Sequence, residues 1–257
     1  MAGAVGAANS AISASATTVS TTGVTTTASG STFLIGCAAD NAVTINTPTD
    51  SNSNAYSPID AKVTFGASSL FSMRWFYCQN GTGGAAHTAT FTTSAASVLY
   101  IGFLELTGVL TSGVLGAHNA ATSVAAAAGG GLPSPVLSLT AYDSIVVAFE
   151  AGDSTSGTAT HTAREGFSII SATDQKTGTI SYTGCLAVKN FRLNGNAQAI
   201  FTEVGGTNCA VAIAEFQSLN PLPYVFIPPD ARGISALKRR MAMNATMKSK
   251  LDPRGWW

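Results

Sequence analysis

Short apolar runs separated by turn-forming residues recur along the chain as far as Leu219. Gly, Asn, Asp and Ser stand between the runs, as turns between antiparallel strands require. The pattern predicts strands at residues 32–38, 61–65, 71–78, 87–93, 97–106, 143–150, 166–170, 179–182, 186–191, 197–202 and 208–216. Residues 111–135 interrupt the series with a low-complexity sequence, which predicts a long surface connection. We therefore expect an all-β fold.

The predicted strands repeat along the chain at one constant offset of 110 residues, as between Ile35 and Ile145 (145 − 35 = 110). At this offset, without a gap, six residues are identical in the pairs Ile35 and Ile145, Ala38 and Ala148, Asn80 and Asn190, Phe91 and Phe201, Thr92 and Thr202, and Glu105 and Glu215. Each half alone would leave sheet edges exposed, so we expect the halves, about 31–110 and 136–219, to pack as one antiparallel β-sandwich over residues 31–219. Two tandem immunoglobulin-like modules are the alternative.

The composition is poor in charge. Charged residues make up 10% of the chain and hydrophobic residues 46%, against roughly 25% charged residues in ordinary globular domains. Because surface charge keeps freely diffusing proteins apart, this shortage predicts a surface covered by neighbouring copies, in a homo-oligomer or a symmetric array. Residues 1–30 are rich in Ala, Ser, Thr and Gly and predict a low-complexity N-terminal arm, in which residues 19–27 are a candidate edge strand.

The net charge of zero conceals a division of charge along the chain. Residues 229–257 hold seven basic and two acidic residues, a net charge of +5, and the remainder holds six basic and eleven acidic residues, a net charge of −5. Such asymmetry predicts a basic arm that meets an acidic or nucleic-acid surface. A solvated tail is the alternative.

The sequence of residues 220–257 predicts an anchoring arm. Prolines in residues 221–229 favour an extended segment, and apolar residues at helical spacing predict a short amphipathic helix at about 230–251. Apolar and aromatic side chains interleaved with the basic ones suit a protein groove better than a phosphate backbone, so we expect protein partners ahead of nucleic acid. The candidate partner-binding residues are Tyr224, Phe226, Ile234, Leu237, Arg239, Arg240, Met241, Trp256 and Trp257.

No motif in the sequence predicts catalysis, a cofactor or a metal site. His87, His118 and His161 share no ligand spacing with acids or cysteines, and we expect His87 and His161 to occupy half-exposed strand positions. The four cysteines predict buried reduced thiols, because they show no paired spacing and three of them lie in apolar runs. We therefore expect no enzyme.

Acidic residues offer two minor alternatives. Glu105 and Glu215 occupy equivalent positions and would suit a general acid/base pair, but strand-terminal carboxylates that face solvent or accept backbone hydrogen bonds are the favoured interpretation. A calcium loop near Asp40, Asn41 and Asp50 lacks a recognised ligand spacing.

Both halves resemble a β-sandwich domain of phage structural proteins and bacterial surface proteins. The matching segments are TFLIGCA, CQN, HTATFTT and YIGFLELTG in the first half, and SIVVAFE, VKN, QAIFTE and VAIAEFQSL in the second. The resemblance covers roughly residues 30–219 and implies a jelly-roll-like sandwich used for display or assembly, without chemistry of its own.

Together these observations predict a virion protein. We expect a structural component of a bacteriophage virion, an accessory or decoration protein of the head or tail, bound to other virion proteins (capsid, neck or tail) through residues 220–257. No apolar run approaches the roughly 18 residues of a membrane span. The alternative is a carbohydrate-binding or adhesive module that recognises a host cell surface. Its candidate residues are Trp75, Phe76, Tyr77 and Tyr100, but most of these alternate into a core strand, and burial is the favoured interpretation for them.

Overall fold

The computed structural model describes residues 3–66, 70–124, 131–154, 160–177, 180–193, 195–204 and 206–219, all within one compact unit, residues 1–222. These residues form antiparallel β-strands and contain no helix, so the all-β prediction is confirmed. The expected extended segment at 221–229 and the expected helix at 230–251 lie outside the described residues.

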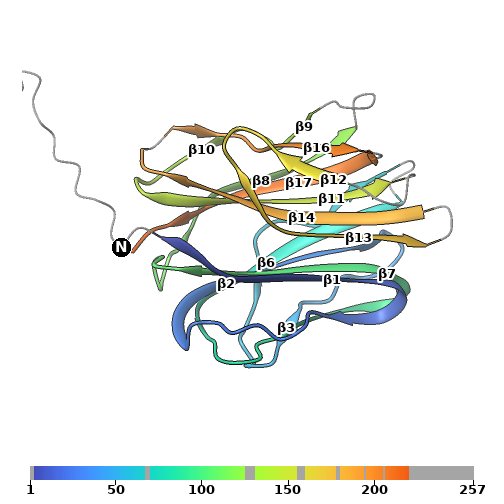
Figure 1. Ribbon diagram of the computed structural model, residues 1–257, viewed down its shortest axis with the longest axis horizontal. Coiled ribbons are helices and arrows are strands. Elements are labelled where there is room, and N and C mark those ends of the chain that lie inside the picture. Colours follow the sequence, from blue (N-terminus) through green and yellow to red (C-terminus); the bar gives the residue numbers. More distant parts are fainter. Residues whose placement is uncertain are drawn as a thin grey trace, which may run out of the picture. The chain divides into compact units, whose positions relative to one another are not determined.

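The first half of the chain forms a seven-stranded sheet (Figure 1). Its main path runs in the order β1 (Ala4–Ser20), β7 (Ala89–Thr107), β2 (Ser29–Asp40), β6 (Phe71–Thr82) and β4 (Ser57–Pro58). Two short strands complete it: β3 (Thr49–Asp50) pairs with β7, and β5 (Val63–Phe65) pairs with β6.

The second half forms a five-stranded sheet and two smaller ones. The five-stranded sheet has the order β13 (Ser168–Thr177), β14 (Ile180–Phe191), β11 (Ser144–Ser154), β17 (Gly206–Gln217) and β8 (Leu115–Val124). A three-stranded sheet contains β12 (Thr160–Ala163), β16 (Ile200–Val204) and β9 (Leu132–Pro133), and β10 (Leu137–Ser138) pairs with β15 (Asn196–Ala197).

The two large sheets repeat one strand order. The path β1, β7, β2, β6 in the first sheet corresponds to β8, β17, β11, β14 in the second. Equivalent residues of β7 and β17 are separated by the offset that the sequence predicts, so that Glu105 and Glu215 occupy equivalent positions. Between β2 and β11 the offset is three positions longer, because Phe33 pairs with Glu105 whereas Val146 pairs with Glu215.

This change of offset corrects part of the sequence alignment. The gapless alignment places Ile35 on Ile145 and Ala38 on Ala148, but these residues do not occupy equivalent positions. The second half holds three more residues than the first between its edge strand, β8, and its central strand, β11. Loops absorb such insertions readily, and the strand pairing then restores the register.

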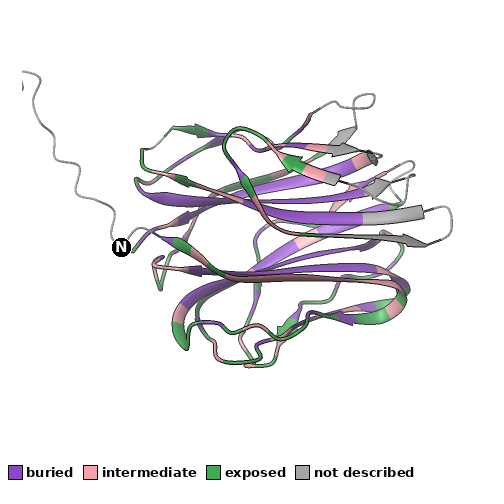
Figure 2. Ribbon diagram, in the orientation of Figure 1, coloured by how far each residue is buried: buried purple, intermediate pink, exposed green. Residues whose placement is uncertain are grey.

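The two large sheets pack face to face around a shared core (Figures 1 and 2). Each half places an aromatic ring over a glycine of the other: Tyr100 lies over Gly184, and Phe149 lies over Gly36. The two rings stack with their centroids 5.9 Å apart. Larger side chains at either glycine would displace the rings, so these glycines set how closely the sheets approach.

Each half also has a core of its own on the outer face of its large sheet, which the sequence did not predict. In the first half this core includes Phe33, Phe91 and Phe103. In the second half it lies between the five-stranded sheet and the smaller strands, and it includes Phe201 and Phe167. The fold therefore has three apolar layers, one shared and two local.

Two segments that were expected to be irregular form edge strands. Residues 4–20 belong to β1 rather than to a separate N-terminal arm, and residues 115–124 within the expected surface connection form β8. Both strands consist mainly of small residues, so they lack the apolar alternation that marks a strand. They pair instead with β7 and β17, whose side chains in the shared core include Tyr100, Leu104 and Phe216.

Candidate functional site

The nine candidate partner-binding residues of the C-terminal arm all lie outside the described residues. Within the described part of the chain, the buried carboxylates, histidines and cysteines are the groups to consider, while His118 lies exposed with its Nδ1 2.8 Å from Asp60 Oδ1. No helix in this part is long and apolar enough to cross a membrane.

Glu105 and Glu215 are buried acceptors of hydrogen bonds. Glu105 is 2% exposed and accepts from the Ala7 amide at 3.1 Å, the Thr27 amide at 2.8 Å and the Ser31 hydroxyl at 2.7 Å. Burial alone would raise the pKa of Glu105, but these hydrogen bonds outweigh it and lower the pKa below the ordinary value.

The second half repeats this arrangement around Glu215, which is fully buried. Glu215 accepts from the Ala117 amide at 3.1 Å, from the amide and hydroxyl of Thr140 at 2.9 and 2.7 Å, from the Ala141 amide at 2.9 Å and from the Ser144 hydroxyl at 2.7 Å. Its pKa is lowered too, because these donors outweigh burial. Both carboxylates are occupied by the protein itself, in agreement with the favoured interpretation of the sequence.

A repeated bulge delivers the alanine amides to these carboxylates. Between Val5 and Ala8, β1 contains one residue more than the segment of β7 with which it pairs. β8 contains an extra residue at the corresponding place, between Leu115 and His118, opposite β17. The sequences VGAANSA at 5–11 and LGAHNAA at 115–121 match at the same offset as Glu105 and Glu215. Sequence comparison could have found this repeat, but low complexity in both segments conceals it.

Asp50 and His87 form a second buried polar group, in the first half. The His87 Nε2 lies 3.0 Å from Asp50 Oδ2, and both side chains are fully buried; the His87 Nδ1 lies 2.9 Å from the Thr26 hydroxyl. The Tyr56 hydroxyl and the Asn54 amide groups also donate to Asp50. The prediction of a half-exposed His87 is wrong, and protein donors fill the carboxylate that was considered for calcium.

The aromatic residues considered for glycan binding are largely internal. Trp75, Phe76 and Tyr100 are each at most 1% exposed, and Tyr77 is half-buried. The Trp75 indole donates to Asp60 at 3.1 Å. These side chains do not form an exposed aromatic platform.

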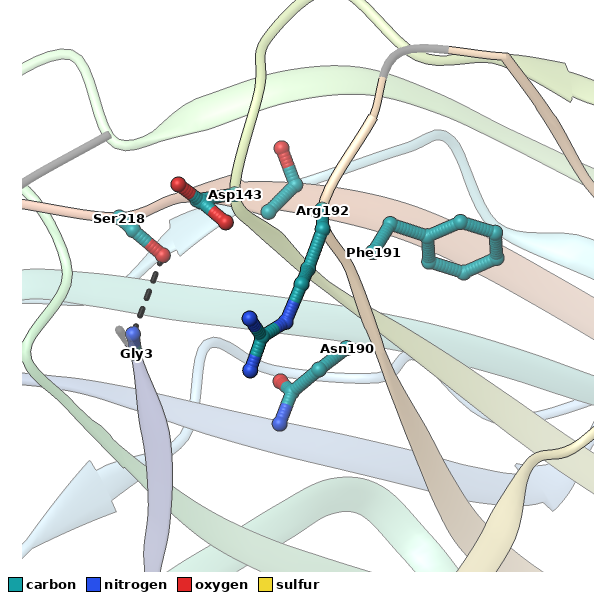
Figure 3. Close-up of a pocket in the computed structure, with 7 residues that line it drawn as sticks. Gly3, Asp143, Asn190, Phe191, Arg192 and Ser218 are labelled. Atoms are coloured by element: carbon teal, nitrogen blue, oxygen red, sulfur yellow. Dashed lines mark hydrogen bonds between the residues drawn. The ribbon is translucent and has the colours of Figure 1, made fainter. Parts of the chain in front are cut away.

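A small surface hollow lies where the ends of β14 and β17 meet the start of β11 (Figure 3). Asp143 and Arg192 line it, and the Gly3 amide donates to the Ser218 hydroxyl at 3.1 Å beside them. No second acid, histidine or cysteine lines the described part of this hollow. Its serines, Ser144 and Ser218, therefore have no histidine beside them among the lining residues to act as a base.

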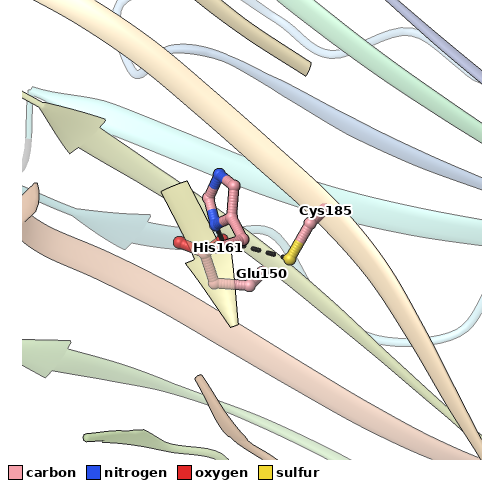
Figure 4. A group of neighbouring side chains, drawn as sticks. All are labelled: Glu150, His161 and Cys185. Atoms are coloured by element: carbon pink, nitrogen blue, oxygen red, sulfur yellow. Dashed lines mark hydrogen bonds and ion pairs between the residues drawn. The ribbon is translucent and has the colours of Figure 1, made fainter. Parts of the chain in front are cut away.

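Glu150, His161 and Cys185 meet inside the core of the second half (Figure 4). The His161 Nδ1 lies 3.1 Å from Glu150 Oε2, and the Cys185 Sγ lies 3.5 Å from the same oxygen. The side chains of Glu150 and His161 are 0% and 2% exposed. Burial, followed by the neighbouring Glu150, raises the pKa of the Cys185 thiol to about 12.

The sequence alone does not predict this cluster. The residues stand on three different strands, β11, β12 and β14, and their separations along the chain match no ligand motif. The prediction of a half-exposed His161 side chain is also wrong, because β12, which carries it, packs onto the larger sheet. The four cysteines are free and buried, as predicted.

Comparison of the chain with protein-family models, with curated proteins and with solved structures found no match. Function must therefore be inferred from the residues and their geometry alone.

Proposed function

We propose that this protein is a structural component of a bacteriophage virion. It acts as an accessory or decoration protein of the head or tail, and residues 220–257 attach it to neighbouring virion proteins. The observation that carries the proposal is the separation of charge between the body and the arm. The arm concentrates seven of the thirteen basic residues of the chain, together with Trp256 and Trp257.

The interior of the body supports a role in construction. Glu105, Glu215 and Asp50 are each surrounded by donors from the protein itself, and that use of carboxylates stabilises a fold rather than a reaction. A binding or decoration role needs no cleft, and the polar hollow beside Asp143 and Arg192 lacks a catalytic set. This distribution disfavours an enzyme.

A jelly-roll-like architecture for each half is part of the proposal. β7 pairs with β3 at Ala89 and Thr90 and with β2 from Leu99 onward, so one long strand has two successive neighbours within one sheet. Its counterpart in the second half divides into β16 and β17, which belong to different sheets. Antiparallel strands arranged in two sheets are the architecture of a jelly roll.

The adhesive alternative is less well supported, since Trp75, Phe76 and Tyr100 are buried. Repeated copies on a symmetric particle would supply avidity even where each arm binds weakly. Protein partners are favoured over nucleic acid, because apolar side chains are interleaved with the basic ones in the arm.

The arm can be tested in the full-length chain by quantifying how much protein co-sediments with purified particles. A variant with Arg239→Glu, Arg240→Glu, Trp256→Ala and Trp257→Ala should leave the particle fraction while its thermal unfolding stays unchanged. The control, Arg164→Glu with Arg192→Glu, makes the same reversal of charge at two exposed body residues and should remain bound.

Three results would contradict the proposal in different ways. Absence of the unmodified chain from every particle fraction would contradict the virion role. Undiminished co-sedimentation of the arm variant would contradict the anchoring role alone. If the chain is retained on deproteinised nucleic acid and released at high salt, the arm binds nucleic acid instead of a protein partner.

A further inference from the structure

The cluster in the second half's own core combines three donor types that zinc prefers: a carboxylate, an imidazole and a thiol. One donor atom from each of Glu150, His161 and Cys185 lies within 4.8 Å of the other two. In a tetrahedral zinc site, with Zn–S at about 2.3 Å and Zn–N and Zn–O at about 2.0–2.1 Å, neighbouring ligand atoms lie about 3.3–3.5 Å apart. The observed separations from Glu150 Oε2, 3.1 Å to His161 Nδ1 and 3.5 Å to Cys185 Sγ, are close to these edges.

The carboxylate of Glu150 is incompletely satisfied by the protein. Its Oε1 is buried and accepts no hydrogen bond from the described residues. Buried carboxyl oxygens normally have partners, since leaving one without them costs free energy. Asp50 in the first half shows the contrast, because Tyr56, Asn54 and His87 all face it.

The neighbouring Thr183 holds the imidazole in the orientation that a metal ligand needs. The His161 Nε2 hydrogen-bonds the Thr183 hydroxyl, while Nδ1 faces the carboxylate and the thiol. Metal-binding histidines commonly donate their second N–H to such a partner, which fixes the tautomer and the ring. Nδ1 is then the nitrogen that faces the other two donors of the cluster.

The cluster is specific to the second half. By strand pairing, Cys37 and Arg74 of the first half occupy the positions of Glu150 and Cys185, because Cys37 pairs with Arg74 as Glu150 pairs with Cys185. The duplicated fold therefore does not require these residue types here. Cys37 is a fully buried thiol in an apolar core and provides a matched control.

We propose that Glu150, His161 and Cys185 bind one zinc ion, which ties the strand β12 of the three-stranded sheet to β11 and β14 of the large sheet. On binding, the Cys185 thiol gives up its proton to solvent and the thiolate coordinates the metal. A carboxylate and a thiolate together neutralise the charge of the divalent ion, so the core holds no net charge. With three protein ligands, the fourth position of the tetrahedral ion would be taken by a water molecule.

The test uses the full-length chain, which is unfolded in the presence of a chelator and a thiol reductant and then refolded with Zn²⁺ or Co²⁺. We expect one metal ion per chain by elemental analysis, a thiolate-to-cobalt charge-transfer band, and a higher unfolding temperature with metal than without it. Cys185→Ala and Glu150→Gln should abolish the stoichiometric metal, whereas Cys37→Ala should retain both metal and band. Thr183→Val should weaken binding about ten- to a hundred-fold.

The proposal is overturned if the unmodified, folded chain shows no stoichiometric metal and no charge-transfer band. Persistence of the band in Cys185→Ala would overturn it too, because the thiolate would then come from elsewhere. If Cys185→Ala or Glu150→Gln fails to fold, Thr183→Val decides in their place. Metal affinity unchanged in folded Thr183→Val would contradict the assigned histidine geometry.

Discussion

The Glu105 carboxylate occupies the space that a side chain on Gly6 would need. A Cβ built on Gly6 would lie 2.3 Å from Glu105 Oε2, and one on Gly116 would lie 2.4 Å from Glu215 Oε2. Both glycines begin the bulge whose next residue donates its amide to the carboxylate. Glycine, bulge and buried acid therefore form one unit, present once in each half.

Gly6→Ala should destabilise the fold by about 1–3 kcal/mol, because the added methyl group must displace a buried, hydrogen-bonded carboxylate. Urea unfolding measures the change. Gly195→Ala is the control: a Cβ there meets no atom within 4 Å, so its effect should stay within about 0.5 kcal/mol. Equal effects at the two positions would show that Glu105 does not determine the requirement for glycine.

Glu105→Gln should lower the free energy of unfolding at neutral pH by about 3 kcal/mol, because the ionised acceptor is lost. The folded-state pKa of Glu105 lies below its ordinary value of 4.5. Its contribution to stability is therefore present above that pH and is lost as the pH falls through the folded-state pKa.

The acid dependence of stability gives a second measure of the same residue. The unmodified protein should lose stability as the pH drops below about 4.5. Glu105→Gln should lose less stability over that interval, because it lacks one carboxylate whose protonation is linked to unfolding. Glu165→Gln, at an exposed position, is the control for the loss of one carboxylate. Parallel profiles for the protein and Glu105→Gln would be inconsistent with a lowered pKa at this residue.

Phe149→Ala should cost about 3–5 kcal/mol, because the ring fills the space over Gly36 and stacks on Tyr100 between the sheets. Leu193→Ala is the control, at a side chain that is 63% exposed. Calorimetry of both variants should show a single transition, since the shared core makes the halves one cooperative unit. Two separate transitions would mean that each half unfolds on its own local core.

Tyr56→Phe should destabilise the fold by about 1–2 kcal/mol, because it removes a 2.7 Å hydrogen bond to the buried Asp50. Tyr77→Phe is a suitable control, because no described residue hydrogen-bonds the Tyr77 hydroxyl. Denaturant titrations of the two variants would separate the hydrogen bond from the general effect of losing a hydroxyl. An equal loss in both would argue against a special role for Tyr56 at Asp50.

The all-β class and the repeat were predictable from the sequence because most strands carry apolar side chains in short runs. β1 and β8 were not, since alanine, serine and threonine give no alternation, and their pairing depends on β7 and β17. The gapless register failed at Ile145 because a loop can take up three residues without disturbing the strand order.

The buried clusters show a different limit of sequence analysis. Glu150, His161 and Cys185 come together only through the pairing of β11 with β14 and the packing of β12 against them. The spacing of these three residues along the chain does not indicate such an arrangement. The Gly-Ala repeats at 6–7 and 116–117 were visible in the sequence, but their meaning required the position of each glutamate.

The central proposal, a virion protein held by its arm, is tested most directly by a cryo-electron microscopy map of the particle that carries this chain. We predict copies of the stacked two-sheet body on the particle surface, with residues 220–257 bound in a groove of a neighbouring virion protein. A particle without the chain, or one that contacts the body while residues 220–257 touch no neighbour, would contradict the proposal.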